Sequence, residues 1–176
     1  MPFSTPFPTP PPPATIPSVA PIPDIALRLA QPSDLDIVTE IRRTAILALA
    51  PSRMTLEAAT AWANRPDRPD RCRSSIEAKK LWLAYEGTDA VGWFEVSDDF
   101  VDGLYVVPSR QGAGVGSTLM GVVEIMIKDR DFEAARLNTA PASQGFYEKL
   151  GYEVMGPAPM GSGMRMWKVL PRTARA

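Results

Sequence analysis

The most constraining feature of the sequence is a glycine-rich stretch between a strand-like pattern and a helix-like pattern. Residues 108–121 read PSRQGAGVGSTLMG; they follow the apolar run GLYVV and precede apolar residues at helical spacing. Glycine accepts positive φ angles and lets another group approach the main chain, but ordering it costs conformational entropy. Clustered glycines at this place therefore predict either a demanding turn or a ligand that lies against the backbone.

The residues before this stretch predict one strand, two helices and a three-stranded meander. IALRLA, which begins at Ile25, predicts the first strand, and the apolar stripe after it predicts a helix that ends by Pro51. A second helix is predicted from Thr55 through Trp62, whereas residues 68–80 show no decisive pattern. LWLAYEG, AVGWFEV and DGLYVV are short branched and aromatic runs separated by turn residues, which predicts antiparallel strands.

The residues after the glycines alternate between helix and strand patterns. A helical stripe ends near Lys128, AARLN predicts a short strand, and Pro141 and Gly151 bracket a further helix. YEVMG and GMRMWKVL predict the closing strands. This order predicts an α/β domain of the mixed α+β kind, with a central, mostly antiparallel sheet flanked by about four helices.

The beginning of the chain differs from the rest in composition. Ten of the 19 prolines lie in residues 1–23, a segment with almost no charge. Residues 1–24 therefore predict an extended or disordered tail, and residues 25–171 predict a single domain. A tail packed along the domain, a linker and an upstream start codon all fit this composition. The segment lacks the positively charged start and unbroken apolar core of a signal peptide.

Composition also excludes several classes of function. The chain has no histidine and one cysteine, Cys72, so we expect no Ser-His-Asp catalysis, no metal site and no internal disulfide. The single cysteine fits a reducing cytoplasm. The net charge of −1 argues against a nucleic-acid partner, and no apolar run approaches the ~20 residues that span a membrane. Acidic neighbours dilute one arginine cluster, which we interpret as a solvated face rather than an anion site: Arg65, Arg68, Arg71 and Arg73.

Three kinds of phosphate-binding turn use glycine. A nucleoside triphosphatase loop needs a lysine, but none occurs between Lys80 and Lys128. A dinucleotide-binding GxGxxG turn is disfavoured because Ser117 replaces its third glycine and Pro108 separates strand from turn. Backbone N–H groups at a helix start remain, and they can bind a pyrophosphate without a cationic side chain. A tight, empty turn is the alternative.

Two segments together resemble a known family. LYVVPSRQGAGVGSTLM resembles the coenzyme A motif of the GNAT superfamily of acetyl-CoA-dependent N-acyltransferases, Arg/Gln-x-x-Gly-x-Gly/Ala after a strand. LNTAPASQGFYEKLGY resembles that family's next segment, an asparagine at a strand end followed by a helix, and the two motifs cover residues 101–152. The resemblance implies a GNAT-like fold with splayed strands, acetyl-CoA as co-substrate, and acetyl transfer to an amine of a small molecule, peptide or protein.

The resemblance also implies which residues bind the cofactor. In the family, the strand matching residues 104–107 splays from the strand matching residues 136–138, and the pantetheine arm lies between them. A backbone N–H near Val106 would stabilise the oxyanion. Many relatives carry lysine or arginine where this chain has Ala113, so phosphate binding would depend on backbone amides, with Arg110 in support. The implied cofactor-binding residues are Leu104, Tyr105, Val106, Val107, Arg110, Gln111, Gly112, Ala113, Gly114, Val115, Gly116, Ser117 and Asn138.

Acetyl transfer from a thioester to an amine needs a base for the ammonium and an acid for the departing thiolate. Tyr147 matches the family's acid position, and next to the core residue Phe146 it is expected to face away from the core stripe. Asp102 and Glu95, on neighbouring predicted strands, are the candidate bases, and a water chain or Glu40 are the alternatives.

No motif identifies the acceptor. The resemblance places acceptor recognition on the first two helices and on the loop from Gly156 to Gly163. A non-catalytic acyl-CoA sensor or interaction module is the alternative function. Dimers are common in the family, so the resemblance also leaves a homodimer open.

Overall fold

The described part of the chain folds around one seven-stranded sheet. A computed structural model describes residues 24–159 and 163–171, so the expected tail lies outside the described residues except for Asp24. The strand order is β1-β2-β3-β4-β5-β7-β6, and every neighbouring pair is antiparallel except β4 and β5. The bounds are β1 Ala26–Leu29, β2 Leu81–Glu86, β3 Asp89–Ser97, β4 Phe100–Val106, β5 Ala134–Thr139, β6 Glu153–Pro157 and β7 Met164–Val169.

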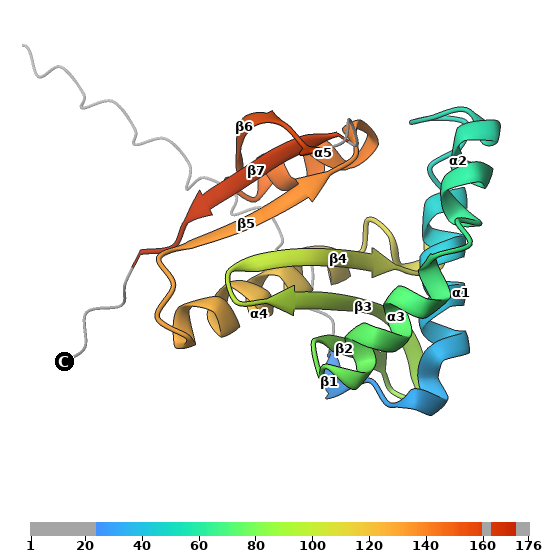
Figure 1. The fold of residues 1–176 in the computed structure, drawn as a ribbon, viewed down its shortest axis with the longest axis horizontal. Coiled ribbons are helices and arrows are strands. Elements are labelled where there is room, and N and C mark those ends of the chain that lie inside the picture. Colours follow the sequence, from blue (N-terminus) through green and yellow to red (C-terminus); the bar gives the residue numbers. More distant parts are fainter. Residues whose placement is uncertain (1–23, 160–162, 172–176) are drawn as a thin grey trace, which may run out of the picture.

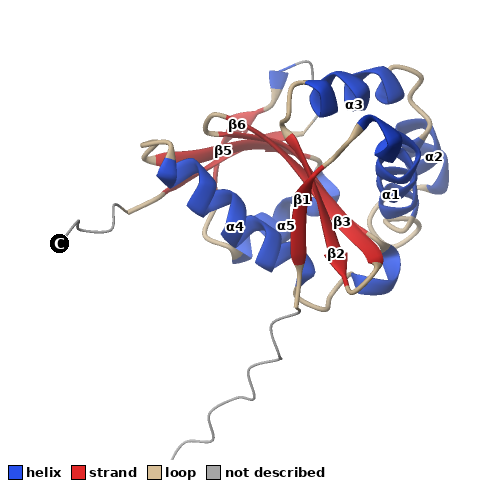
Figure 2. Ribbon diagram, turned by 90° about the horizontal axis from the view of Figure 1, so that it is seen from below, coloured by secondary structure: helices blue, strands red, loops and turns tan. Residues whose placement is uncertain are grey.

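Helices cover both faces of the sheet (Figure 2). α4 and α5 contribute to one core, and α1 and α3 contribute to the other, while α2 packs on α1. The bounds are α1 Leu35–Leu47, α2 Leu56–Ala63, α3 Arg68–Glu77, α4 Val115–Asp129 and α5 Pro141–Lys149, with short 3-10 turns at Pro32–Asp34 and Pro108–Arg110.

The only parallel pair of this sheet separates soon after it begins (Figure 1). β4 and β5 pair at Phe100 with Arg136 and at Val101 with Leu137, and no further pair joins these strands. Beyond this point β4 stays with β3, whereas β5 stays with β7. The sheet therefore opens between β4 and β5 into two splayed groups of strands, as the resemblance implied.

Strand alternation assigns the side chains of β3 and β4 to two different cores. Phe94 and Leu104 face the core beneath α4 and α5, whereas Trp93 and Tyr105 face the core beneath α1 and α3. The opening between β4 and β5 is thus flanked by two sets of side chains, one on each face of the sheet.

The mixed α/β class and the antiparallel meander are confirmed. The structure has five α-helices rather than about four, because residues 68–77 form α3. This helix buries only Cys72 and Ile76, a stripe too short to show a helical period in the sequence.

The described residues contain neither a candidate membrane-spanning helix nor a candidate metal cluster. None of the helices within residues 24–159 and 163–171 is both long enough and apolar enough to cross a membrane. In the same ranges, no group of three or more His, Cys, Asp or Glu side chains is placed to hold a metal ion.

Candidate active site

Backbone groups of β4 face the opening between the splayed strands. The N–H of Val107 donates to the carbonyl oxygen of Val91 at 2.9 Å, and Trp93 pairs with Tyr105 in the same register. Because bonded and non-bonded pairs alternate in an antiparallel ladder, the N–H and C=O groups of Leu104 and Val106 point away from β3. These groups therefore point toward β5, where the ladder has ended.

The glycine-rich turn leads into the start of α4 with its amides free. The N–H groups of Gly112 and of residues 114–117 donate to no group of the described residues. The turn is exposed except for Val115 and Gly116. Free N–H groups at the start of a helix, together with the helix dipole, form an anion-binding site.

The glycines of this turn serve two different purposes. Gly112 and Gly114 have φ angles of +77° and +87°, and nothing lies within 4 Å of a Cβ placed on either. They meet the conformational demand of the turn. Gly116 has an ordinary φ, but a Cβ there would lie 3.1 Å from the ring of Phe146, so this glycine lets α5 pack against the start of α4.

Replacing Gly114 with alanine is expected to lower the free energy of unfolding by about 1–2 kcal/mol, because a side chain disfavours the left-handed conformation. The matched control is Gly121→Ala, inside α4, where a Cβ would also meet nothing within 4 Å but φ is not positive. That change should raise the free energy of unfolding by about 0.5–1 kcal/mol. Denaturant unfolding measures both, and equal effects would contradict the conformational explanation.

Two polar side chains beside the turn, those of Arg110 and Gln111, are bound within the protein. Arg110 forms an ion pair with Glu86 at 2.5 Å, so its guanidinium is partly engaged. The side-chain amide of Gln111 donates to the carbonyl oxygen of Val106 at 3.1 Å. Asn138 is exposed on β5 and pairs with Arg165 of β7. The backbone amides are thus the free donors of the turn.

Tyr147 lies in the core, which corrects the expectation that it faces away from it. Only 8% of its surface is exposed, and its ring packs edge-on against Phe146 and Tyr152. The reason is that α5 turns Tyr147 toward α4 and the sheet, while Phe146 is half-buried against Gly116. Burial, followed by the nearby Tyr105, raises the pKa of the Tyr147 phenol well above its usual range.

Glu95 is a half-buried carboxylate on β3. The hydroxyl of Ser75 donates to its Oε1 at 2.5 Å. Burial raises the pKa of Glu95 above its usual value, the Ser75 hydrogen bond opposes this rise, and the negative charge of Asp102 adds to it. Glu95 pairs with Gly103, directly before the segment of β4 whose backbone faces the opening.

A β-bulge changes the position of Asp102. The β3 partners step from Gly103 to Val101 and skip Asp102, so Asp102 does not share a face with Leu104, although simple strand alternation would predict that it does. Val101 and Leu104 both face the core beneath α4, and Asp102 is exposed. The structure therefore brings Glu95 and Asp102 into electrostatic contact but gives them different environments. Glu40 lies apart on α1, in an ion pair with Arg43.

The sequence did not single out Ser75 or Arg42, and it placed Arg68 on a solvated face. Ser75 and Arg68 come from α3, which had no pattern, and Arg42 comes from α1. The guanidinium of Arg42 lies 5.8 Å from the ring centroid of Tyr105, and the Tyr105 ring lies tilted against Trp93 with their centroids 4.7 Å apart. One signal was available in the sequence, because Arg42 is four residues after Val38 on the apolar stripe of its helix.

Comparison with protein families identifies the class. Residues 51–168 match the family described as the Acetyltransferase (GNAT) domain. This match covers most of the chain, and the chain belongs to the GNAT acetyltransferase family.

One curated relative is the peptidyl-lysine N-acetyltransferase YjaB of Escherichia coli strain K12. It is 30% identical over 93 residues, which cover 52% of this chain and 62% of that protein. The chain thus matches less than two thirds of the length of this relative.

Solved structures share the fold at low sequence identity. A GCN5-related N-acetyltransferase from Rhodopseudomonas palustris has a TM-score of 0.77 at 24% identity, covering 86% of this chain and 98% of its own. The PaiA N-acetyltransferase of Thermoplasma acidophilum, in complex with coenzyme A, has a TM-score of 0.70 at 19% identity, covering 83% and 99%. YncA from Salmonella typhimurium, with its cofactor acetyl-CoA, has a TM-score of 0.60 at 20% identity, covering 87% and 98%.

Proposed function

We propose that this chain transfers the acetyl group of acetyl-CoA to a primary amine by direct attack, with Glu95 as general base and Tyr147 as general acid. The observation that carries the proposal is the set of free amides of Gly112 and of residues 114–117, beside the opening between β4 and β5. Membership of the GNAT family supports it, as do PaiA and YncA, whose structures hold coenzyme A and acetyl-CoA.

The residues of the chain fit this cofactor. The free amides of the turn and the start of α4 would hold the pyrophosphate. The outward-pointing backbone groups of Leu104 and Val106 would bind the amide-containing arm as an added strand would, with Asn138 across the opening. When bound, acetyl-CoA supplies an activated acetyl group on a thiol leaving group.

Three groups of the chain would perform the transfer. Glu95 would remove a proton from the acceptor ammonium, and a carboxylate with a raised pKa suits this task better than an ordinary one. The N–H of Val106 would donate to the acetyl oxygen as negative charge develops on it. Tyr147, which burial keeps protonated, would donate its proton toward the sulfur.

The central test combines binding with turnover. Purified protein is mixed with acetyl-CoA and a panel of amines that includes lysine peptides, since YjaB carries the name peptidyl-lysine N-acetyltransferase, and released thiol is measured. Amine-dependent thiol release is expected. If calorimetry shows that coenzyme A binds but no amine is acetylated, the alternative function, a non-catalytic acyl-CoA sensor, is favoured. If coenzyme A does not bind, both the transferase and the sensor functions are overturned.

The Ser75 hydrogen bond predicts a shift in the pH dependence of turnover. This bond lowers the pKa of Glu95, so Ser75→Ala should raise that pKa further. Activity requires the ionised carboxylate, so the acid limb of kcat/KM is expected to move to higher pH. A pH profile measures this shift, and an unmoved or lowered limb would contradict the role of Glu95 as base.

A further inference from the structure

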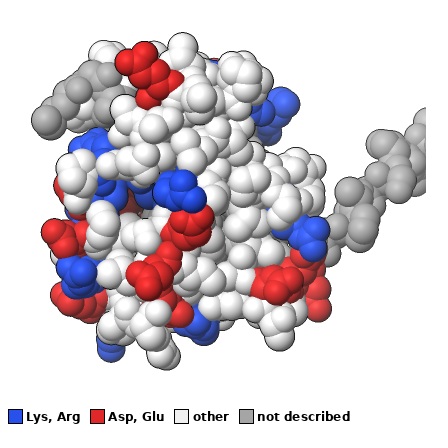
Figure 3. All heavy atoms as spheres, turned by 90° about the vertical axis from the view of Figure 1, so that its right-hand side faces the viewer, with Lys and Arg blue, Asp and Glu red and all other residues white. Residues whose placement is uncertain are grey.

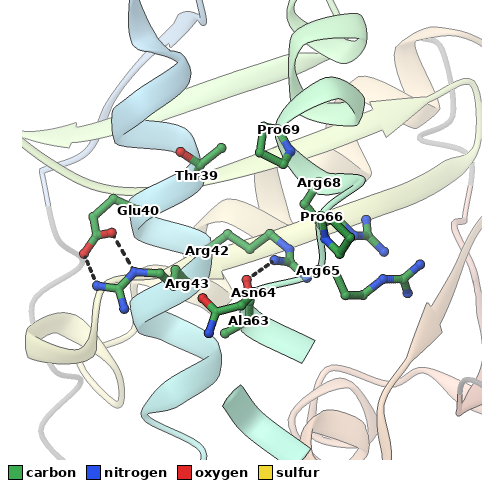
Figure 4. A pocket seen from close by; sticks show the side chains of 10 residues that line it. All are labelled: Thr39, Glu40, Arg42, Arg43, Ala63, Asn64, Arg65, Pro66, Arg68 and Pro69. Carbon is green, nitrogen blue, oxygen red and sulfur yellow. Dashed lines mark hydrogen bonds and ion pairs between the residues drawn. The ribbon is translucent and has the colours of Figure 1, made fainter. Parts of the chain in front are cut away.

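A pocket of about 260 Å³ lies between α1, the end of α2 and the start of α3 (Figure 4). Four arginines line this pocket. Arg42 and Arg43 come from α1, Arg65 comes from the turn before α3, and Arg68 is the first residue of α3. Glu40 is the one acidic residue of the lining. Basic and acidic side chains are interspersed on this side of the molecule (Figure 3). The charge of the pocket therefore depends on which arginines have partners.

Two of the four arginines are neutralised by carboxylates. Arg43 pairs with Glu40 at 2.7 Å, and Arg65 pairs with Asp67 at 3.2 Å. These exposed pairs agree with a solvated face, as expected for the arginines of residues 65–73.

Arg42 is buried and forms no ion pair with a described carboxylate. It is 2% exposed and donates to the carbonyl oxygens of Trp62 and Ala63, both at 3.0 Å, at the end of α2. Its Nε is buried without a partner. The two carbonyls hold the side chain in place, but they leave a full charge under the pocket.

Arg68 is half-buried and has no hydrogen-bond or ion-pair partner among the described residues, which corrects the solvated-face interpretation at this residue. Its Nε is buried and unpaired, and no hydrogen bond or ion pair joins the guanidinium to any described residue. Burial lowers the pKa of Arg68; the nearby Tyr105 opposes this shift, and the charge of Arg42 adds to it. Arg68 also stands in the first turn of α3, where the helix dipole adds positive potential.

Asp67, which is already paired with Arg65, also attracts Arg68, but no carboxylate of the described residues forms an ion pair with Arg68 or Arg42. All 20 Asp and Glu residues fall within the described ranges, so residues 1–23, 160–162 and 172–176 contain none. Burying a charge without an ion-pair partner costs folding free energy, and Arg42 and Arg68 place two such charges at one pocket. Glu40 and Asp67 balance two of the four arginines, so the pocket keeps an excess of positive charge that is suited to an anion from outside.

We propose that this pocket binds the carboxylate of the amine acceptor, with Arg68 as its direct ligand and the charge of Arg42 beneath it. The inference rests on the proposed function and names its substrate class, a small amine that carries a carboxylate, as amino acids do. The free donors belong to the single planar guanidinium of Arg68, which matches a carboxylate in two parallel hydrogen bonds. A volume of about 260 Å³ is below that of sites for whole drug-sized ligands, and it suits one end of a small acceptor.

Charge complementarity orients such an acceptor. Arg42 contacts the ring of Tyr105, and Tyr105 belongs to the segment of β4 that borders the opening. Glu95 and Asp102 lie along the same pair of strands. The carboxylate of the acceptor is attracted to Arg68 and repelled by Glu95, whereas its ammonium has the opposite preferences, so the amine is directed to the proposed base.

The test compares amines that differ only in the carboxylate. kcat/KM is measured for L-phenylalanine against 2-phenylethylamine and for L-lysine against 1,5-diaminopentane, in the wild-type chain and in Arg68→Gln. The wild type should prefer the carboxylate member of a pair. Arg68→Gln should lower kcat/KM for the amine with the carboxylate by about 10- to 100-fold, because a charge-assisted hydrogen bond is lost. It should change kcat/KM for the amine without the carboxylate little.

The matched control is Arg73→Gln, which lies on the same helix outside the pocket lining and removes an arginine already paired with Asp70. It should leave both members of each pair within about threefold of the wild type, because exposed ion pairs contribute little. Equal losses for both members in Arg68→Gln, or a wild-type preference for the amines without carboxylate, would overturn the proposal.

Calorimetry separates a failed subsite from a failed function. If no amine is acetylated, binding of N-acetyl-L-phenylalanine is compared with that of N-acetyl-2-phenylethylamine in the presence of coenzyme A. The carboxylate site is supported, even though acetyl transfer fails, if the wild type binds only N-acetyl-L-phenylalanine and Arg68→Gln no longer binds it. Binding of neither, or of both equally, overturns it. Thermal unfolding checks that Arg68→Gln is folded, and removing an unpaired buried charge should not lower its Tm.

Discussion

Replacing Glu95 with glutamine is expected to lower kcat/KM for acetyl transfer by about 10²- to 10⁴-fold, the usual contribution of a positioned general base. Glutamine keeps the shape of the side chain and can still accept the hydrogen bond from Ser75, which is 2.5 Å long in the wild type. It cannot take a proton from an ammonium. The loss should be greatest for acceptors with high pKa values, because these are almost fully protonated at neutral pH.

The same substitution should stabilise the fold at neutral pH. A folded-state pKa above the unfolded value means that the folded protein disfavours the ionised carboxyl. Wild-type stability therefore falls as pH rises from the ordinary pKa of glutamate through the raised pKa of Glu95, and it stays lower above that window. Glu95→Gln removes this penalty, so its free energy of unfolding should exceed that of the wild type at pH 7, with the difference shrinking below the ordinary pKa of glutamate. Urea titrations at several pH values measure this.

Asp102→Asn is the matched control for Glu95→Gln. Asp102 is exposed, and its charge raises the pKa of Glu95. Its removal should leave turnover at pH 8 nearly unchanged and should move the acid limb to lower pH, opposite to the effect of Ser75→Ala. If Asp102→Asn abolished turnover while Glu95→Gln did not, the two roles would be reversed.

Much of the fold could be predicted because its signals are local. The glycines, the meander and the helix that starts after Ala140 each follow from residues that are neighbours in the sequence. The free amides of the turn are also a local property, since the first turn of any helix lacks internal partners for its N–H groups. A short stretch of sequence was therefore enough to predict the turn and the strand and helix that flank it.

Other features depend on how distant segments meet. The bulge at Asp102 inserts one residue into β4, and strand alternation in the sequence contains no mark of it. The burial of Tyr147 depends on Tyr152 and α4, which fix how α5 rotates against the sheet. Arg68 looked like its exposed neighbours because the sequence does not show which arginine of the cluster faces Arg42.

The second large effect is expected for Tyr147→Phe, which should lower kcat/KM by about 10²-fold or more through loss of the general acid. The ring would remain packed against Phe146 and Tyr152, so stability should change little. No hydrogen bond joins the Tyr147 hydroxyl to a described residue, so its removal leaves no partner within residues 24–159 and 163–171 unsatisfied. A loss of activity without a loss of stability would point to the hydroxyl itself.

The pH dependence distinguishes an acid from a packing residue at Tyr147. Because its pKa lies well above the ordinary value of tyrosine, the phenol stays protonated as pH rises, and turnover should show no basic limb from Tyr147 below about pH 10. The acid limb belongs to Glu95, so Tyr147→Phe should lower kcat/KM by the same factor at every pH. Thiol release from a thioester with a better leaving group, a thiophenol, needs less protonation and should recover much of the lost rate. Equal loss with both thioesters would assign Tyr147 to packing alone.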